Sequence, residues 1–550
     1  MVTRALLVGS LLLVFGTALL QAETPSELAE RRLRESAKSE LPGVAVLVAR
    51  DGRILFQGGY GLADVEGKTP ITPETKFRIG SVTKQFTAAA ILRLAEEGKL
   101  ALTDSLAKYF PELPNAQTIT LRHLLTHTSG LHGYTEKPGF HAGVTKPITP
   151  ANLIASLRAD PPDFPPGTNF RYSNSGYFVL GEIVAKVSGQ SLADYLRIAF
   201  FEPLAMKDTA IFMNAAPPSG VARGYTIGDG KATLSMDWDM SWAGGAGGLY
   251  STVGDLLHWN EALHGGRVLK PESLQAMTTP HPLPPGANGL NYAFGLTVSQ
   301  VSRLPVISHS GGLQGWSSDL MWLPAQRLTI VALSNAMPTL PGLEPTSITR
   351  DLVSRFLADE IAKLPPPIED KTVDPKTYPA FVGRYDYQAA ILTVTVENDR
   401  LYAQLTGQKP FEISPRSADE FFFNIADAQI AFIRNEKGAV VAVQHTQNGN
   451  TFRAPRLAVE AVALTAEQLD AFVGSYQYGL DSVLTVKREG TQLLAQLTGQ
   501  PPLPIFATAE DSFEWRIVAA QVRFAKGADG KITKATHTQN GITFDAPKIK

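Results

Sequence analysis

Ser81 and Lys84 lie one helical turn apart at the start of an apolar segment, FRIGSVTKQFTAAAILRLAEEGKL. Residues spaced i and i+3 share one face of a helix, so the hydroxyl and the amine point the same way. A serine hydroxyl becomes a good nucleophile only when a neighbouring group takes its proton. An amine that is desolvated in a protein interior has a lowered pKa and can accept that proton. The pair therefore predicts a nucleophilic Ser81 that is served by Lys84.

The spacing alone does not identify a catalytic pair, because Ser105 and Lys108 share it. About one or two such matches arise by chance in a chain of this length. The second pair follows a loop and leads into Tyr109-Phe110-Pro111, so we interpret it as a short capped helix with a solvated lysine. The assignment of Ser81 therefore depends on motifs further along the chain.

Two later segments carry polar groups at the ends of apolar elements. The segment FPPGTNFRYSNSGYFVLGEIV places Tyr172 and Asn174 between a loop and an apolar helix, and VISHSGGLQGW places His309 and two glycines at the end of an apolar strand. A His-x-Gly triplet also begins at His141 and at His264. Each motif is therefore weak alone, and their order along the chain is what is informative.

In this order the motifs resemble the serine β-lactamase and penicillin-binding superfamily, in the branch of class C β-lactamases, DD-peptidases, D-aminopeptidases and certain esterases. The resemblance covers about residues 25–364 and extends to TPETKFRIGSVTK, LRHLLTHTSGL and GGAGGLYSTVGDL. It implies an α+β fold in which a β-lactamase-like antiparallel sheet is flanked by helices and carries a helical subdomain.

The resemblance also implies roles for the polar groups. Ser81 would form an acyl-enzyme, and Asn174 would orient Lys84 and the substrate amide. Tyr172, near cationic neighbours, is expected to be the base that activates Ser81 or the incoming water. The backbone N–H groups of Ser81 and Gly312 would bind the developing oxyanion.

The strand that carries His309 is expected to bind substrate. Gly311 beside Ser310 lets a substrate backbone approach and pair with this strand. Trp316 either lines the pocket or is a buried aromatic at the end of a strand. Class C β-lactamases have lysine where this chain has His309, whereas DD-peptidases and D-aminopeptidases have histidine. Histidine titrates near neutrality, so an imidazolium here would give a bell-shaped pH profile.

Composition excludes several other classes of protein. Lysine plus arginine number 50 and aspartate plus glutamate 52, with no long run of either sign, so neither nucleic acid nor an anionic membrane surface is expected as a partner. There is no cysteine, and the 10 histidines lack the pairing of zinc sites, so no metal and no cofactor is expected. His123 and His127, one turn apart, lack a third ligand and are interpreted as packing and loop-anchoring residues.

Elements at both ends of the hydrolase segment are expected to form one sheet. A helix is predicted over 25–38, followed by a hairpin that turns at Asp51-Gly52. Strand-like runs return late, in LPVISHSGG, SSDLMWLP and RLTIVALSNA, and a helix is predicted over 348–364. Strands from both ends with helices between them favour one antiparallel sheet with a helical insert.

Beyond a proline-rich break the chain repeats itself at an interval of about 91 to 92 residues. FVGRYDY is echoed by FVGSYQY, and HTQNGNTFRAP by HTQNGITFDAP. Alternating apolar residues predict that each copy is a small all-β barrel, lipocalin-like in form. The paired copies also resemble the barrels appended to D-aminopeptidases. His445 and His537 lie beside the Asn-Gly turns and are given structural roles.

The first residues, MVTRALLVGSLLLVFGTALLQA, predict a cleavable signal peptide and a periplasmic or secreted protein without a stable membrane span. A retained single anchor is the alternative. The expected divisions are a signal peptide (1–22), a hydrolase domain (23–364), a linker (365–378), a first barrel (379–457), a second linker (458–467) and a second barrel (468–550).

These patterns predict an exported serine hydrolase that acts on short peptides or amides, including those with D-residues. Two alternatives remain open at this point. One is a carboxylesterase on short acyl esters that uses the same residues. The other is a penicillin-binding or wall-binding protein with little turnover, for which peptidoglycan fragments would be the partner. The small substrate would be a peptide, an amide or an ester.

Overall fold

The computed structural model describes residues 23–549, except for 138, 212–218, 229, 285–286, 288–289, 388–389, 425–426, 436, 448–449, 458–463, 479–481, 491, 499–501, 516–519, 528 and 540–541. The predicted signal peptide, residues 1–22, lies outside the described residues. Within the described part, no helix has the length and apolarity that crossing a membrane requires.

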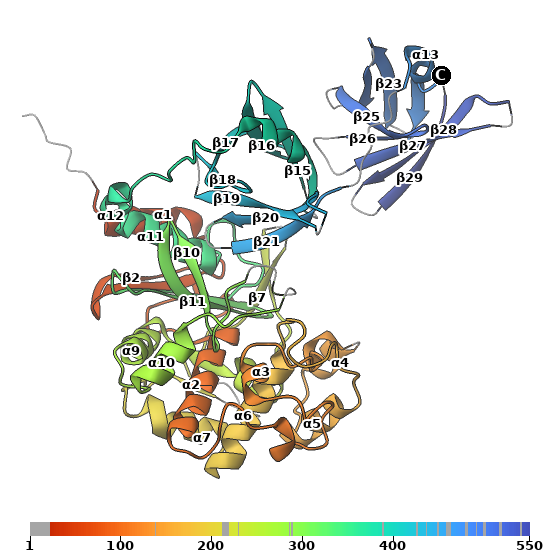
Figure 1. Cartoon of the computed structure of the whole chain (residues 1–550). Helices are drawn as coiled ribbons and strands as arrows, with labels where there is room; N and C mark the ends of the chain where they lie inside the picture. The colour runs from red at the N-terminus through yellow and green to blue at the C-terminus, as the bar shows by residue number, and fades with distance from the viewer. Residues whose placement is uncertain are drawn as a thin grey trace, which may run out of the picture.

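A six-stranded antiparallel sheet with the order β10-β11-β12-β13-β1-β2 forms the centre of the N-terminal domain (Figure 1). Strand β1 pairs with both β2 and β13, so the two ends of the domain meet in the middle of the sheet, as predicted. The hairpin turns at Asp51 and Gly52, which have φ of 52° and 73°. The strands are β1 (Val44–Arg50), β2 (Arg53–Tyr60), β10 (Thr297–Val301), β11 (Leu304–Leu313), β12 (Trp316–Leu323) and β13 (Leu328–Ser334).

One face of the sheet is covered by helices from both ends of the domain: α1 (Pro25–Ser36), α11 (Pro345–Phe356) and α12 (Ala358–Lys363). Val46 and Ile330 pack there against Leu33 and Leu352 in one apolar core. The helix predicted over 348–364 is two helices that meet at Leu357. This packing leaves the second face of the sheet for the candidate site.

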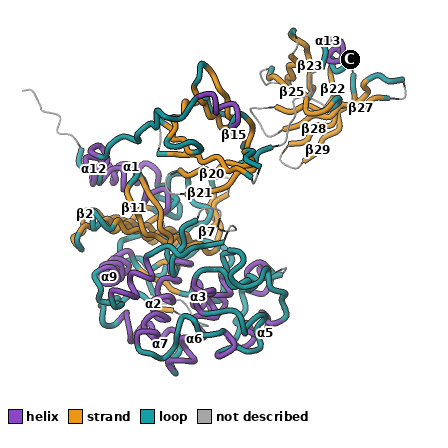
Figure 2. Tube along the Cα trace, viewed as in Figure 1, coloured by secondary structure: helices purple, strands orange, loops and turns teal. Residues whose placement is uncertain are grey.

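The second face carries the helical subdomain, which includes segments far apart in sequence (Figures 1 and 2). Helix α2 is buried along most of its length, and Phe86 stacks on Trp259 with ring centroids 4.0 Å apart. The helices of this subdomain are α2 (Thr83–Glu96), α3 (Leu121–Leu125), α4 (Phe140–Gly143), α5 (Pro150–Arg158), α6 (Asn174–Ser188), α7 (Leu192–Leu196), α8 (Gly244–Gly247), α9 (Val253–His264) and α10 (Pro271–Thr278). The short strands of the N-terminal domain, outside the six-stranded sheet, are β3 (Leu62–Asp64), β4 (Thr69–Pro70), β5 (Phe77–Arg78), β6 (Ala210–Ile211), β7 (Tyr225–Gly228), β8 (Lys231–Leu234) and β9 (Leu249–Ser251).

Two nearly closed eight-stranded barrels follow, each with its strands paired in chain order, which confirms the predicted fold class (Figure 1). Tyr385 pairs with Arg456 to close the first barrel, and Tyr476 pairs with Lys548 to close the second. The first comprises β14 (Gly383–Asp386), β15 (Ile391–Glu397), β16 (Arg400–Leu405), β17 (Phe411–Pro415), β18 (Glu420–Phe423), β19 (Ala428–Arg434), β20 (Val440–Gln447) and β21 (Asn450–Pro455). The second comprises α13 (Ala466–Asp470), β22 (Gly474–Gln477), β23 (Val483–Glu489), β24 (Gln492–Leu497), β25 (Leu503–Ala509), β26 (Ser512–Trp515), β27 (Ala520–Lys526), β28 (Ile532–Gln539) and β29 (Ile542–Pro547).

The two barrels repeat the same contacts internally, but they differ in the residues through which they contact each other. The Tyr385 hydroxyl donates to the Phe381 carbonyl at 2.7 Å, and its counterpart Tyr476 does the same one repeat later at 2.8 Å. Between the barrels, Arg384 forms a buried ion pair with Glu514. The other copy has serine and phenylalanine at these two positions. The copies have therefore diverged where they contact each other.

Candidate active site

Ser81 and Lys84 meet at the entrance of the buried helix α2. Ser81 lies in a single 3₁₀ turn, Gly80–Val82, that leads directly into this helix. Lys84, in the first turn of α2, has a fully buried side chain. Its Nζ atom lies 2.9 Å from the Ser81 hydroxyl oxygen. The predicted pair is therefore in direct contact.

The surroundings of Lys84 suit a neutral amine. Burial lowers its pKa well below the usual value, and no carboxylate offsets this effect among the described groups. Two carbonyl-type oxygens accept from its Nζ atom, Asn174 Oδ1 at 2.9 Å and the Ala246 carbonyl at 2.8 Å. A neutral amine has two N–H groups and one lone pair. In a neutral Lys84 the two acceptors would take both N–H groups, which would leave the lone pair for the hydroxyl of Ser81.

Asn174 is fixed from a second side. It is the first residue of α6, and Ser173 caps this helix by accepting from the Gly176 N–H. The Asn174 amide nitrogen donates to Thr135 Oγ1 at 3.2 Å, which leaves its carbonyl oxygen for Lys84. Thr135 was not predicted as a site residue, because it lies in a loop with no local signal. Its hydroxyl sets which end of the Asn174 amide faces the lysine.

Tyr172 lies against the same lysine, with its ring centroid 4.8 Å from Lys84 Nζ. Its hydroxyl is buried and forms no hydrogen bond with the described residues. Burial raises the pKa of Tyr172, and the nearby hydroxyl of Ser81 lowers it by less. The raised pKa favours the protonated phenol over the phenolate that a base would need. The role of Tyr172 as the base stays a prediction.

His309 is buried on β11 with both ring nitrogens occupied. Its Nδ1 lies 2.6 Å from the Ser310 carbonyl oxygen and therefore donates to it, and its Nε2 accepts from the Tyr292 hydroxyl at 3.1 Å. Burial is the main cause that lowers the pKa of His309 to about 3, and Lys84 lowers it as well whenever its amine is protonated. This shift favours a neutral ring at neutral pH, and the acidic or basic limb that an imidazolium would add to the pH profile stays a prediction. Tyr292 carries no sequence signal that would have pointed to it.

His127 also contacts the aromatic residues of the candidate site, although the sequence indicated only packing and loop anchoring for it. Its Nδ1 accepts from the Ser173 N–H at 3.1 Å, which is the expected anchoring contact. Its ring also lies 4.2 Å from that of Tyr172 and 4.7 Å from that of Tyr292. Burial lowers its pKa, and Lys84 and His309 lower it further. His127 thus packs against one side of the Tyr172 ring.

The end of β11 lies directly on the turn that carries Ser81. A Cβ atom at Gly311 would lie 2.0 Å from the Ile79 carbonyl oxygen, and one at Gly80 would lie 2.9 Å from the Gly312 nitrogen. Gly80 also has a positive φ of 48°. These contacts bring the Gly312 backbone to the turn that carries Ser81, as the predicted oxyanion hole requires. The close approach of Gly311 is to the protein's own backbone.

Trp316 and Ser310 do not join the side chains that surround Lys84. The Trp316 ring is buried under the Arg78 guanidinium, 4.6 Å away, and a Cβ atom at Gly224 would lie 2.5 Å from the ring. Trp316 is therefore a buried aromatic at the end of a strand and does not line the pocket. Ser310 follows His309 in a strand, so its side chain points to the opposite face of the sheet.

The second serine–lysine pair has the surroundings that the sequence predicted. Ser105 caps a short 3₁₀ helix, and the exposed Lys108 pairs with Asp104 at 2.8 Å, which confirms that interpretation. His123 accepts from the Thr120 N–H in a capping contact. Among the residues that the structure describes, no cluster of His, Asp or Glu could hold a metal ion.

Comparison with known proteins identifies the hydrolase domain. The model of the beta-lactamase family matches residues 29–353, more than half of the chain. The chain belongs to the β-lactamase family. Members of this family are serine hydrolases that include penicillin-binding proteins and amidases. A domain of unknown function (DUF3471) matches residues 369–454, which span the first barrel.

Individual members of the β-lactamase family are similar over much of the chain. Penicillin-binding protein 4* of Bacillus subtilis is 28% identical over 413 residues, which are 72% of this chain and 90% of that protein. The D-amino acid amidase of Ochrobactrum anthropi is 26% identical, with a TM-score of 0.53 over 60% of this chain and 99% of its own. The octameric penicillin-binding protein homologue of Pyrococcus abyssi shares the fold, at 23% identity and a TM-score of 0.54 over 86% of this chain and 97% of its own.

We expect one acidic limb in the profile of kcat/KM against pH, and we assign it to Lys84. The amine is neutral and active above its lowered pKa and protonated below it, so kcat/KM rises with pH through that value. His309, with a pKa of about 3, stays neutral through the assay range. His309→Gln should therefore lower kcat/KM without moving the limb. A limb that shifts in this variant would show that His309 titrates.

Proposed function

We propose that this protein is an exported amidase or peptidase that forms an acyl-enzyme through Ser81 and acts on short substrates with D-amino acid residues. The observation that carries the proposal is the buried Lys84 amine, whose Nζ lies 2.9 Å from the Ser81 hydroxyl oxygen and donates to Asn174 Oδ1 and to the Ala246 carbonyl. Export to the periplasm or the medium follows from the predicted signal peptide.

Acylation begins when the Ser81 oxygen attacks the carbonyl carbon of the substrate and its proton passes to Lys84 Nζ. The carbonyl oxygen becomes an oxyanion that accepts from the backbone N–H groups of Ser81 and Gly312. Such preorganised donors contribute about 10²- to 10³-fold each to the rate in comparable enzymes. The buried position of Lys84 keeps the amine neutral and ready for this step.

The leaving amine needs a proton before the carbon–nitrogen bond breaks. The Tyr172 hydroxyl is protonated, buried and without a partner among the described residues, so it can donate to that nitrogen. The proton that Lys84 took from Ser81 then passes to the phenolate and restores it. Water deacylates the enzyme by the reverse route, with its proton moving to Lys84 and the Ser81 oxygen regaining one.

His309 favours amides over β-lactams as substrates. A neutral imidazole cannot supply the fixed positive charge that a lysine at this position supplies in class C β-lactamases. The similarity to a D-amino acid amidase over nearly that whole protein supports the same choice. The similarity to penicillin-binding protein 4* supports a second candidate, a wall-binding protein that acylates and turns over slowly.

A side-by-side substrate screen tests the proposal. The panel comprises D- and L-phenylalanine amide, D-alanyl-D-alanine peptides, short p-nitrophenyl esters and a chromogenic cephalosporin. We expect turnover of amides with D-isomers preferred, and little or no cephalosporin turnover. Ester hydrolysis without any amide cleavage would favour a carboxylesterase. A stoichiometric burst without turnover on every substrate would favour the penicillin-binding alternative.

A further inference from the structure

The face of β11 that lies opposite His309 carries polar residues where a covered sheet face is normally apolar. Ser308 lies between Thr297 on β10 and Met321 on β12, and Ser310 lies opposite Asp319. Helices α1 and α11 cover the apolar part of this face. The polar part extends beyond them, toward the edge strand β10.

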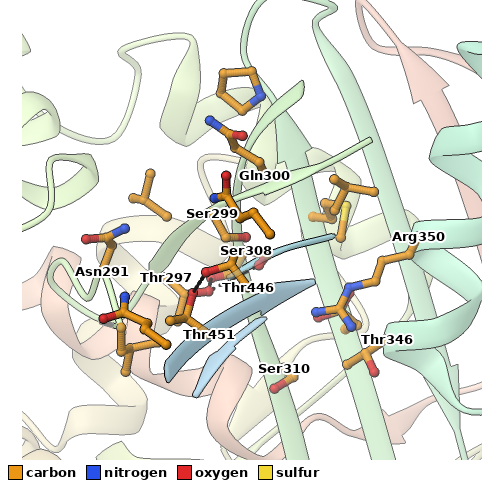
Figure 3. A pocket seen from close by; sticks show the side chains of 18 of the residues that line it. Asn291, Thr297, Ser299, Gln300, Ser308, Ser310, Thr346, Arg350, Thr446 and Thr451 are labelled. Atoms are coloured by element: carbon orange, nitrogen blue, oxygen red, sulfur yellow. Dashed lines mark hydrogen bonds between the residues drawn. The ribbon is translucent and has the colours of Figure 1, made fainter. Parts of the chain in front are cut away.

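The first barrel covers this polar part. The Arg303 N–H donates to Asp427 Oδ2 at 3.0 Å, and the Asp370 N–H donates to the Pro415 carbonyl at 2.8 Å. These bonds join the hydrolase domain and the linker to the barrel. Between the sheet and the barrel remains a cavity of about 690 Å³, which we name the sheet–barrel cavity (Figure 3). Pockets of this size hold small organic ligands and often lie where domains meet.

The barrel's side of the cavity is polar as well, and it is specific to the first copy. Strands β19, β20 and β21 contribute Gln429, Gln444 and a pair of threonines, Thr446 and Thr451, whose hydroxyls lie 2.9 Å apart. Arg416 donates to Gln429 Oε1 at 2.9 Å from the loop after β17. The second copy keeps the threonines but has threonine at the positions of Arg416 and Gln444.

The charges that line the cavity favour an anionic ligand. Arg350 enters from α11 (Figure 3). Arg416 comes from the barrel, directly after β17. The carboxyl of Asp319 accepts from Thr349 Oγ1 at 2.5 Å, and burial raises its pKa to about 7. Among the charged residues that line the cavity, the two guanidinium groups therefore outnumber the single carboxyl. Guanidinium groups bind carboxylates through paired, charge-assisted hydrogen bonds.

We propose that the sheet–barrel cavity is a second ligand site, which binds a short peptide or an acylated amino acid through its free carboxylate. No aromatic side chain is among the described residues that line it, so a sugar ring would find no stacking partner there. All five residues of β10, 297 to 301, border the cavity, which therefore follows the outermost strand of the sheet. On the outer side of this strand the Val298 N–H already donates to the Asn291 carbonyl at 2.9 Å, so the edge available to a ligand lies beyond Val298. An extended peptide can pair with such an edge while its carboxylate reaches the arginines.

The cavity is separate from the candidate active site, but strand β11 borders both. Ser310 borders the cavity, and its carbonyl oxygen accepts from His309 on the other face. The proposal does not depend on which bond Ser81 attacks. Its test uses the full chain with Ser81→Ala, so that binding is measured without acylation and a failed hydrolase assignment cannot mask the result.

Isothermal titration calorimetry of this protein with N-acetyl-D-alanyl-D-alanine and with N-acetyl-L-alanine tests the site. We expect measurable binding of a carboxylate and at least tenfold weaker binding of the matching neutral amide. Arg416→Gln and Gln444→Glu should each weaken carboxylate binding about tenfold or more, because one removes a donor pair and the other adds a repelling charge. Inorganic phosphate and chitotriose serve as the competing ligand classes.

The matched control is Arg400→Gln, since Arg400 lies on the same barrel, is exposed and pairs with Glu412 away from the cavity. Its binding should equal that of the parent protein. Equal affinity for acid and amide, tighter binding of phosphate or chitotriose, or unchanged carboxylate binding in Arg416→Gln would each overturn the proposal. So would the absence of binding by every probe.

Discussion

Replacing Lys84 with methionine is expected to slow acylation of Ser81 by about 10²- to 10⁴-fold, the range of a lost general base. Methionine fills a similar apolar volume but cannot take the serine proton. Ser81→Ala should abolish acylation altogether. Both are measured with a fluorescent phosphonate or penicillin, by the rate and extent of covalent labelling.

The chain contains its own control for this experiment. Ser105 and Lys108 have the same spacing, but the serine caps a helix and the lysine is exposed. Ser105→Ala and Lys108→Met should therefore leave the labelling rate unchanged. Labelling that persists in Ser81→Ala would show that another residue is the nucleophile. Full-rate labelling in Lys84→Met would mean that the serine proton leaves by another route.

Gly311→Ala is expected to reduce kcat by about 10²-fold or more while the domain remains folded, a loss on the scale of one oxyanion donor. The new Cβ atom would lie 2.0 Å from the Ile79 carbonyl oxygen, so strand and turn must separate. Separation moves the Gly312 N–H away from Ser81. The measurement is kcat on the best substrate of the screen, with circular dichroism and thermal melting as checks of folding.

Gly228→Ala is the matched control, because Gly228 also ends a strand but a Cβ atom added there would meet no other part of the described chain within 4 Å. It should change neither kcat nor the melting temperature appreciably. Unchanged kcat in Gly311→Ala would show that the oxyanion site does not need this close approach. A large fall in melting temperature with kcat unchanged would give Gly311 a role in stability alone.

Local features could be predicted because neighbouring residues decide them. Helix α1 begins at a capping box in which Thr24 accepts from the Glu27 N–H and Glu27 accepts from the Thr24 N–H. The hairpin turns at Asp51-Gly52, since both residues tolerate a positive φ. The two barrels were visible as a repeat, and the strand order within each follows the chain.

The candidate site was predicted only in part. Ser81 and Lys84 are three residues apart, so a helix alone brings them together. The order of motifs then pointed to Tyr172 and Asn174. No local pattern indicated Tyr292, which reaches His309 from a loop, and the motif around His127 did not reveal its contact with Tyr172.

By itself, the sequence determined the serine–lysine pair, the order of elements and the repeated barrels, because these depend on spacing, periodicity and turn residues. Only the tertiary structure decided in which direction the pKa values of Lys84, Tyr172 and His309 shift, since distant segments desolvate all three groups. It also decided that Ser310 faces the sheet–barrel cavity. Alternation along a strand separates two sets of side chains, but which set meets the nucleophile depends on what packs against each face.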